Sequence, residues 1–230
     1  MNIYILTSDK NIQIVEGLQY CINKYWKPNP KVILLGYKEP KFELDSNFTF
    51  ISLGEDRGAG KVGEDIITYF SKVLDEHFIF SVDDFFPIRE VNIDILDNLI
   101  NTMVDKNVSR IALTDQVSNK PNSVIKELDG YNIIEMGQKS PYRKSAVWSM
   151  WNRDYFLKYF TEDSSLWSWE LDEKCKDDTH RILGTEGKYV LQSCHLYKRG
   201  NLKSDWYKDS ESSDTMLAED HVIISDIVYS

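Results

Sequence analysis

The sequence predicts an α/β fold with a mostly parallel central sheet flanked by helices, and three observations support this. Short apolar runs typical of buried strands alternate with stretches in which apolar residues recur at helical spacing. Glycine, proline and polar residues separate these segments, as expected of turns. The apolar run 78–82 ends in two adjacent carboxylates, Asp83 and Asp84. In open α/β sheets, ligands bind beyond the carboxyl ends of such strands.

The first 75 residues predict strand, helix, strand, strand and helix, the order typical of a parallel sheet. The proline-containing sequence KPNP at 27–30 ends the first helix, because proline lacks the backbone donor that a helix needs. Strands are expected at 2–7, 31–36 and 48–53, and helices at 12–26 and 64–75.

The second half of the chain predicts a mixture of helices and strands. The segment 114–126 is polar and contains Pro121, so we expect a loop there. Further helices are expected at 92–105, 154–160 and 169–175, and strands at 109–113, 131–136 (antiparallel), 142–148 and 189–197.

Composition excludes several classes of protein. A formal net charge of -10 argues against a nucleic-acid surface, which needs clustered Lys and Arg. No apolar run approaches the roughly 18 residues of a membrane span, and the first residues do not resemble a secretory signal. Three cysteines without CxxC spacing favour a reducing compartment. We therefore expect a cytoplasmic protein; the sequence leaves its oligomeric state open.

The glycine-rich loop GEDRGAGKVG, residues 54–63, partly resembles the phosphate-binding P-loop, GxxxxGK followed by Ser or Thr. The pattern fails, because Glu55 and Val62 occupy positions that require glycine and a hydroxyl. What remains is flexible backbone with Arg57 and Lys61 near the start of a helix, where anions bind favourably. The alternative is a solvated turn with incidental cations.

The acid pair Asp83–Asp84 carries the strongest functional signal. Ionised carboxylates at the end of an apolar strand need a cationic partner, because burying an unpaired charge is costly. A divalent ion that prefers oxygen ligands and phosphate satisfies this requirement. The alternative is that both residues cap a helix beginning near Ile88.

The order of elements, the glycine-rich loop and the acid-tipped strand FSVDDFFP resemble the nucleotide-binding half of GT-A fold glycosyltransferases. In these enzymes a DxD-type motif holds Mn²⁺ or Mg²⁺ against the diphosphate of a nucleotide sugar. Ser81 stands here in place of the first Asp. The segment SAVWSMWNRDYFLKYFTEDSSLWSWELD, residues 145–172, is similar to the acceptor side of small bacterial and viral sugar transferases.

This resemblance implies one domain over 1–203, with a nucleotide-sugar half, 1–90, and an acceptor half, 91–203. A polar and acidic tail, 204–230, is expected to be mobile or to order with ligand. The implied activity is an inverting, hexosyltransferase-like transfer from a nucleotide-diphosphate sugar to a carbohydrate hydroxyl. The ion would be held by Asp84 with His195, and Asp83, Arg57 and Lys61 would contact the donor.

The other roles come from the resemblance and from the chemistry of the transfer. Thr7 and Asp9 follow the first strand, where such enzymes contact base and ribose. An inverting transfer needs a general base, for which Glu170 is the first candidate and Asp172 the second. Trp167 and Trp169 belong to a tryptophan cluster that is core by default, with one or two members stacking on a sugar ring.

Two alternatives stay open at this stage. One is a non-catalytic carbohydrate- or protein-binding module that keeps the fold with a degraded site, which the Ser81 departure leaves possible. The other is a sugar nucleotidyltransferase, which would require a longer glycine-rich signature after the first strand than the segment 7–10 supplies.

Overall fold

The chain forms two compact units, described separately below. Unit 1 comprises Arg57–Phe80 and Asn92–Val190, and unit 2 comprises Asn2–Asp56, Ser81–Val91 and Leu191–Ser230. The chain passes repeatedly between them, so neither unit coincides with the expected halves 1–90 and 91–203. The computed structural model describes residues 1–105, 108–118, 120–128, 130–198, 201–202 and 216–229.

Unit 2 contains a parallel sheet with the strand order β3-β2-β1. Every residue of β1 and β2 is buried, and the intervening helix contributes Ile14, Leu18 and Ile22 to the same core. The expected strand-helix-strand-strand order is confirmed. The elements are β1 (Ile3–Leu6), α1 (Ile14–Tyr25), β2 (Val32–Gly36) and β3 (Phe48–Ser52).

A second, smaller sheet follows the acid pair. Strand β5 (Phe85–Pro87) pairs antiparallel with β11 (Ser193–His195), so that Phe85 lies opposite His195. A short ladder joins β12 (Tyr197–Lys198) to β13 (Asn201–Leu202). The acid pair therefore leads into a strand, and the alternative in which it caps a helix near Ile88 is wrong.

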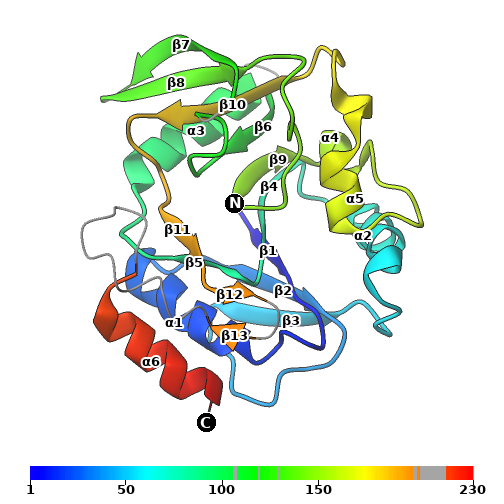
Figure 1. Ribbon diagram of the computed structural model, residues 1–230, viewed down its shortest axis with the longest axis vertical. Coiled ribbons are helices and arrows are strands. Elements are labelled where there is room, and N and C mark those ends of the chain that lie inside the picture. The colour runs from blue at the N-terminus through cyan, green and yellow to red at the C-terminus, as the bar shows by residue number, and fades with distance from the viewer. Residues whose placement is uncertain (106–107, 119, 129, 199–200, 203–215, 230) are drawn as a thin grey trace. The chain divides into compact units, whose positions relative to one another are not determined.

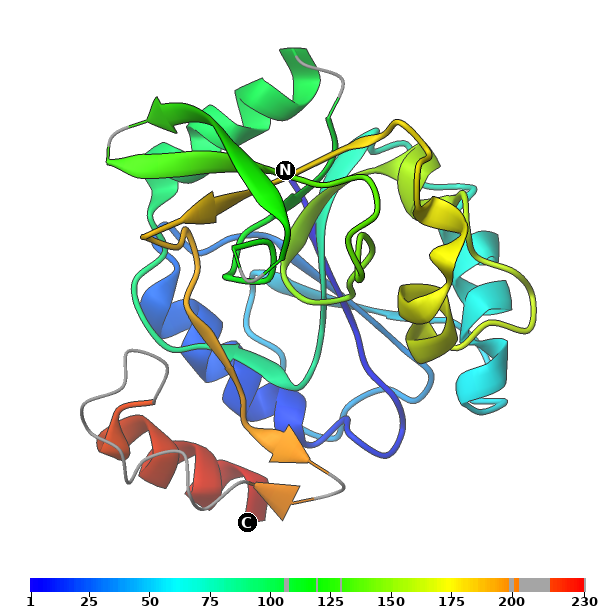
Figure 2. The same cartoon turned by 45° about the horizontal axis from the view of Figure 1, so that its top comes forward.

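Helix α6 (Ala218–Tyr229) packs against α1 in unit 2, and both views show the two helices side by side (Figures 1 and 2). Asp220 is fully buried at this contact. It accepts hydrogen bonds from Tyr20 at 2.8 Å, from Lys24 at 2.5 Å and from the Tyr25 hydroxyl. Where a mobile tail was expected over 204–230, residues 218–229 thus form a packed helix; residues 203–215 lie outside the described part of the chain.

Unit 1 contains a mixed sheet in which strands β4, β6, β10 and β7 run in one direction and β9 and β8 in the other. With the parallel sheet of unit 2, this confirms the predicted fold class. The strands, in spatial order, are β4 (His77–Val82, which enters unit 2 at Ser81), β9 (Ser149–Asn152), β6 (Val108–Ala112), β10 (Arg181–Glu186), β8 (Tyr131–Met136) and β7 (Asn122–Leu128).

An aromatic core joins the helices of unit 1 to its sheet. Phe70 stacks on Phe78 with ring centroids 4.8 Å apart, and Phe156 contacts both rings. Trp169 stacks on Phe160 at 4.5 Å. The helices are α2 (Val62–Phe70), α3 (Ile93–Asp105), α4 (Arg153–Leu157) and α5 (Leu166–Leu171), with short 3₁₀ helices at Ala59–Lys61 and Glu173–Cys175.

Three segments of unit 1 differ from expectation. The strand predicted at 142–148 lies instead at β9, the predicted loop 114–126 includes the start of β7, and β10 was not predicted. Gly184 explains part of the last miss. A Cβ at Gly184 would lie 2.8 Å from Val117, so close packing requires a residue that weakens a strand pattern. None of the described helices is long and apolar enough to cross a membrane.

Candidate active site

The acid pair lies directly beyond the ends of two strands in unit 2. The Asp83 backbone N–H donates to the carbonyl of Leu6, the last residue of β1, at 3.2 Å. This hydrogen bond places Asp83 next to Thr7, which follows β1 and is buried. The acid pair and the end of the first strand therefore lie side by side within unit 2.

Asp83 is buried, and hydrogen bonds offset only part of the cost of burying its charge. Only 4% of the residue is exposed, and its Oδ1 accepts a hydrogen bond from Asn11 at 3.4 Å. Among the described residues, Oδ2 has no hydrogen-bond partner. Burial raises the pKa of Asp83 to about 7; hydrogen bonds from Thr7, Asn11 and Ser8 oppose this change in part, and the charge of neighbouring Asp84 adds to it.

Asp84 contacts His195, the other residue that the resemblance implied as a metal ligand. Its Oδ2 lies 2.8 Å from Nε2 of His195, and the imidazole stacks on Phe85 with ring centroids 4.8 Å apart. The Leu196 N–H donates to the Asp84 carbonyl at 3.2 Å, so the backbone also fixes the pair. Within the described part of the chain, the buried Oδ1 of Asp84 lacks a hydrogen-bond partner.

These groups fit a divalent cation that shares its coordination with a ligand. The described residues contain no cluster of three or more His, Cys, Asp and Glu side chains arranged to hold a metal. Asp84 and His195 supply two metal ligands. Among the described residues, Asp83 Oδ2 and Asp84 Oδ1 are buried without hydrogen-bond partners, and burying their charge without a partner is unfavourable. Mg²⁺ is commonly bound by one or two carboxylates, with phosphates and waters completing the shell. The site therefore suits an ion that arrives with a phosphate.

Asp9, the other residue predicted for donor binding in unit 2, is engaged elsewhere in the structure. Its Oδ1 accepts the backbone N–H of Lys38 at 2.9 Å, and its Oδ2 pairs with the Lys38 ammonium at 2.9 Å. These bonds hold the pKa of the Asp9 carboxyl below its ordinary value. Contact with a ribose would replace part of this pairing.

The two cations of the glycine-rich loop belong to unit 1, where both are in ion pairs. The Arg57 guanidinium forms ion pairs with Glu64 at 3.1 Å and with Asp65 at 2.5 Å. Lys61 meets Asp163 at 2.6 Å. Both cations are thus engaged with carboxylates of their own unit.

Glu170 lies in unit 1 at the C-terminal end of α5 and is fixed by a backbone donor. The N–H of Ala146 donates to its Oε1 at 2.5 Å. The carboxylate also acts on the buried Arg110: burial lowers the pKa of this guanidinium to about 10, and the charge of Glu170 opposes that change. Arg110 is held over the Trp151 ring at 5.2 Å.

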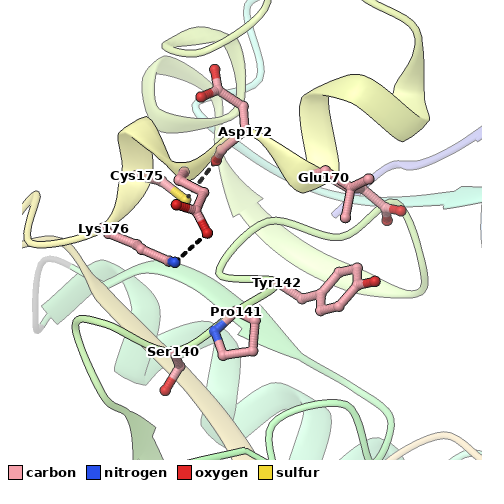
Figure 3. A pocket seen from close by; sticks show the side chains of 9 residues that line it. Ser140, Pro141, Tyr142, Glu170, Asp172, Cys175 and Lys176 are labelled. Carbon is pink, nitrogen blue, oxygen red and sulfur yellow. Dashed lines mark hydrogen bonds and ion pairs between the residues drawn. The ribbon is translucent and has the colours of Figure 1, made fainter.

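A small cavity of about 70 Å³ lies beside Glu170 (Figure 3). In Figure 3, the Glu170 and Tyr142 side chains project to one side of the cavity, whereas the Asp172 carboxylate points away from them. Asp172 caps the following 3₁₀ helix by accepting the Lys174 N–H at 3.0 Å. Two segments line the cavity, residues 140–142 and residues 170–173, 175 and 176.

The two tryptophans of α5 have different environments. Trp169 is 1% exposed and packs within the aromatic core, where it cannot stack on a ligand. Trp167 is 65% exposed. Of the two candidates, only Trp167 presents its ring at the surface.

Sequence reasoning did not select three residues that shape these sites: Asn11, Arg110 and Tyr142. A signal existed for Arg110, because an arginine in the otherwise apolar strand SRIAL must find buried acceptors. The guanidinium donates to Ser149, to Gln116 and to the carbonyls of residues 142 and 143. Asn11 lies in a turn outside any periodic pattern, and Tyr142 begins the segment 142–148, where a strand was expected and the structure has a turn.

No protein-family model matches the chain, and no curated protein sequence matches it. Among solved structures, S. aureus TarS 1–349 has a TM-score of 0.51 and 12% identity, covering 82% of this chain and 58% of that one. The chain thus spans a little over half the length of this relative. At such low identity the likeness shows the fold alone.

Two further structures have TM-scores below 0.5. The mannosyltransferase PcManGT from Pyrobaculum calidifontis, in complex with GDP-Man and Mn²⁺, has a TM-score of 0.48 and 11% identity, covering 86% of this chain and 57% of that one. A UDP-glucose pyrophosphorylase complexed with UDP-glucose has a TM-score of 0.47 and 11% identity, covering 99% of this chain and 98% of that one.

Proposed function

We propose that this protein is a glycosyltransferase that moves a sugar from a nucleotide-diphosphate sugar to a hydroxyl group of a carbohydrate acceptor. The observation that carries the proposal is the acid pair beyond β4. Two buried carboxylate oxygens, Asp83 Oδ2 and Asp84 Oδ1, lack partners among the described residues, and His195 lies 2.8 Å from Asp84. Buried carboxylates in this state favour binding of a cation.

In this proposal Asp84 and His195 hold Mn²⁺ or Mg²⁺ together with the donor diphosphate. The bound ion would neutralise the negative charge that develops as the nucleoside diphosphate leaves. Asp83, with Asn11 on its other oxygen, orients the pair and adds negative charge beside the ion. Thr7 and Asp9 are the proposed contacts for base and ribose, and Arg57 and Lys61 for phosphate.

The fold likeness supports the choice of donor. TarS, with which this chain shares a fold, has been crystallised in complex with UDP-GlcNAc. The acid-tipped strand FSVDDFFP and its position in the order of elements resemble GT-A glycosyltransferases. Both points favour a nucleotide sugar as substrate.

Glu170 is the proposed general base for an inverting transfer. Its orientation is set by the Ala146 N–H, and it lines the cavity shown in Figure 3. A carboxylate held in this way accepts the proton of an attacking hydroxyl if that hydroxyl comes within hydrogen-bond reach. Asp172 is the second choice, because its carboxylate is engaged in capping a 3₁₀ helix.

The proposal is tested by screening hydrolysis and transfer with UDP- and GDP-sugars, with and without Mn²⁺. We expect at least one donor to be turned over in a metal-dependent way. Glu170→Gln should lower turnover by about 100-fold or more, within the range for loss of a general base. Glu162→Gln, at an exposed carboxylate that lies outside α5, is the matched control. Normal turnover of the Glu170→Gln enzyme would refute the base assignment.

A further inference from the structure

The cavity beside Glu170 has a composition suited to one kind of ligand. Its lining includes three carboxylates, Glu170, Asp172 and Glu173, and one cation, Lys176, which pairs with Glu173. A surplus of carboxylates repels anions and accepts hydrogen bonds from hydroxyl groups. At about 70 Å³ the cavity is well below the roughly 300 Å³ of a pocket that encloses a whole small molecule. It can receive one hydroxyl-bearing edge of a larger ligand.

Tyr142 enters this cavity from a strained backbone position. Its φ is 57°, in the left-handed region that non-glycine residues seldom adopt. Arg110, which is fully buried, donates to the carbonyls of Tyr142 at 3.3 Å and of Arg143 at 3.2 Å. The buried guanidinium therefore holds this turn. Backbone strain of this kind persists where the surrounding structure enforces it, and it concentrates at binding and catalytic sites.

The Tyr142 ring remains accessible although it has a partner. The Lys120 ammonium lies 5.2 Å from the ring centroid, a cation–π contact that restrains the orientation of the ring. Even so, 40% of Tyr142 is exposed. In Figure 3 the ring lies on the same side of the cavity as the Glu170 carboxylate. An exposed, oriented aromatic ring beside a carboxylate presents an apolar face next to a hydrogen-bond acceptor.

We propose that this cavity is a subsite for an uncharged carbohydrate, in which the Tyr142 ring stacks on the C–H face of the sugar and the Glu170 carboxylate accepts its hydroxyls. The proposal rests on the proposed function, in which Glu170 is the general base, and it names the acceptor as a neutral pyranoside. An aromatic ring gives a sugar ring an apolar platform with polar groups at its edge. Tyr142 is then a residue that determines acceptor binding.

The test is saturation-transfer NMR on the full chain with the methyl glycosides of glucose, galactose, mannose and N-acetylglucosamine, and with methyl glucuronide as the anionic comparison. We expect at least one neutral glycoside to give a saturation-transfer signal. The anionic methyl glucuronide should give none. Tyr142→Ala should weaken binding about tenfold, the value of one aromatic contact. Tyr142→Phe should retain binding because the ring remains.

Two further variants protect the test against misfolding and non-specific contact. Tyr142→Gly removes both the ring and the backbone strain, so it should lose binding while its melting temperature stays the same or rises. Tyr229→Ala, at an exposed tyrosine of α6 in unit 2, should bind like the parent protein. The subsite is overturned if no neutral glycoside binds, if Tyr142→Gly binds as well as the parent, or if the glucuronide binds best.

The binding measurement uses no nucleotide sugar and does not depend on turnover. Its result is therefore independent of whether the protein is a glycosyltransferase. Glycoside binding that depends on Tyr142, without any nucleotide-sugar turnover, would support the subsite and contradict the proposed transferase activity. Turnover that depends on Asp84 and Glu170, without glycoside binding at Tyr142, would do the reverse.

Discussion

Nε2 of His195 lies 2.8 Å from Oδ2 of Asp84 although 111 residues separate them in the chain. The pairing of β5 with β11 produces this contact, because it sets His195 opposite Phe85, the residue after Asp84. The stacked Phe85 ring fixes the imidazole plane. A histidine oriented in this way can share a cation with the carboxylate, and several predictions depend on that relationship.

Replacing either member of this pair should weaken the affinity of the site for the metal ion that supports turnover. His195→Asn should raise the Mn²⁺ concentration needed for half-maximal donor hydrolysis by about tenfold or more, since one ligand is lost. The measurement is a Mn²⁺ titration of donor hydrolysis at fixed nucleotide sugar. Asp226→Asn, at an exposed carboxylate of α6, serves as the control. An unchanged titration curve for His195→Asn would exclude the histidine as a ligand.

Asp83 should make stability fall as the pH rises. Its folded pKa of about 7 lies above the ordinary value of 3.8 because the carboxyl is buried. Between these two values the folded state holds the proton more tightly than the unfolded state, so ionisation costs about 4 kcal/mol of unfolding free energy by pH 8. Urea unfolding from pH 4 to pH 8 should show this loss in the parent protein.

Asp83→Asn should largely remove that pH dependence, because the amide cannot ionise. Mn²⁺ with a nucleoside diphosphate should restore stability to the parent protein more strongly at pH 8 than at pH 5, where a proton competes with the ion. Equal pH dependence in the parent and the Asp83→Asn variant would contradict the assignment of the raised pKa to this residue.

Asp220 should stabilise the contact between α6 and α1 in the opposite pH range. Burial alone would raise its pKa, but hydrogen bonds from Lys24, Tyr25 and Tyr20 outweigh burial and lower it. The stabilisation is therefore present above the unfolded pKa of about 3.9 and is lost as the pH falls through the lower folded value. Asp220→Asn should cost about 3 kcal/mol at pH 7.

Urea unfolding at pH 7 and below pH 4 measures this effect, and the difference from the parent protein should shrink in acid. Asp226→Asn again provides a matched carboxylate change on the same helix. A cost below about 0.5 kcal/mol, the usual range for surface substitutions, would mean that α6 does not depend on the buried carboxylate.

The glycine-rich loop should prove sensitive at Gly63 and tolerant at Gly60. A Cβ at Gly63 would lie 2.1 Å from the Thr161 carbonyl oxygen, whereas a Cβ at Gly60 would meet nothing within 4 Å. Gly63→Ala should therefore destabilise the protein by about 3 kcal/mol, and Gly60→Ala should be neutral or slightly stabilising. Equal melting temperatures for the two variants would show that close packing does not explain Gly63.

Much of unit 2 could be predicted because its strands are short apolar runs bounded by turns. β1, β2 and β3 fall within one or two residues of their predicted limits. β10 and α6 could not be found in this way. β10 contains a glycine that packs against Val117, and α6 has apolar residues on both its buried and its exposed faces, so neither gives a clean periodic pattern.

The site followed the same division. Asp83 and Asp84 were identifiable because acids at the end of an apolar strand require an explanation, whereas His195 was expected only from the resemblance. In the structure His195 contacts Asp84 within unit 2. Trp169 illustrates the limit, since burial in the aromatic core is decided by tertiary packing. Tyr142 was missed because its position depends on the buried Arg110, a contact that no local pattern encodes.

The central claim is that Asp84 binds a divalent ion shared with a nucleoside diphosphate. Isothermal titration of UDP and of GDP into the protein, with and without Mn²⁺, tests it most directly. We predict that the parent protein and Asp226→Asn bind one of these nucleotides only when Mn²⁺ is present, and that Asp84→Asn binds neither. Nucleotide binding by Asp84→Asn with the same affinity and metal dependence as the parent would contradict the claim.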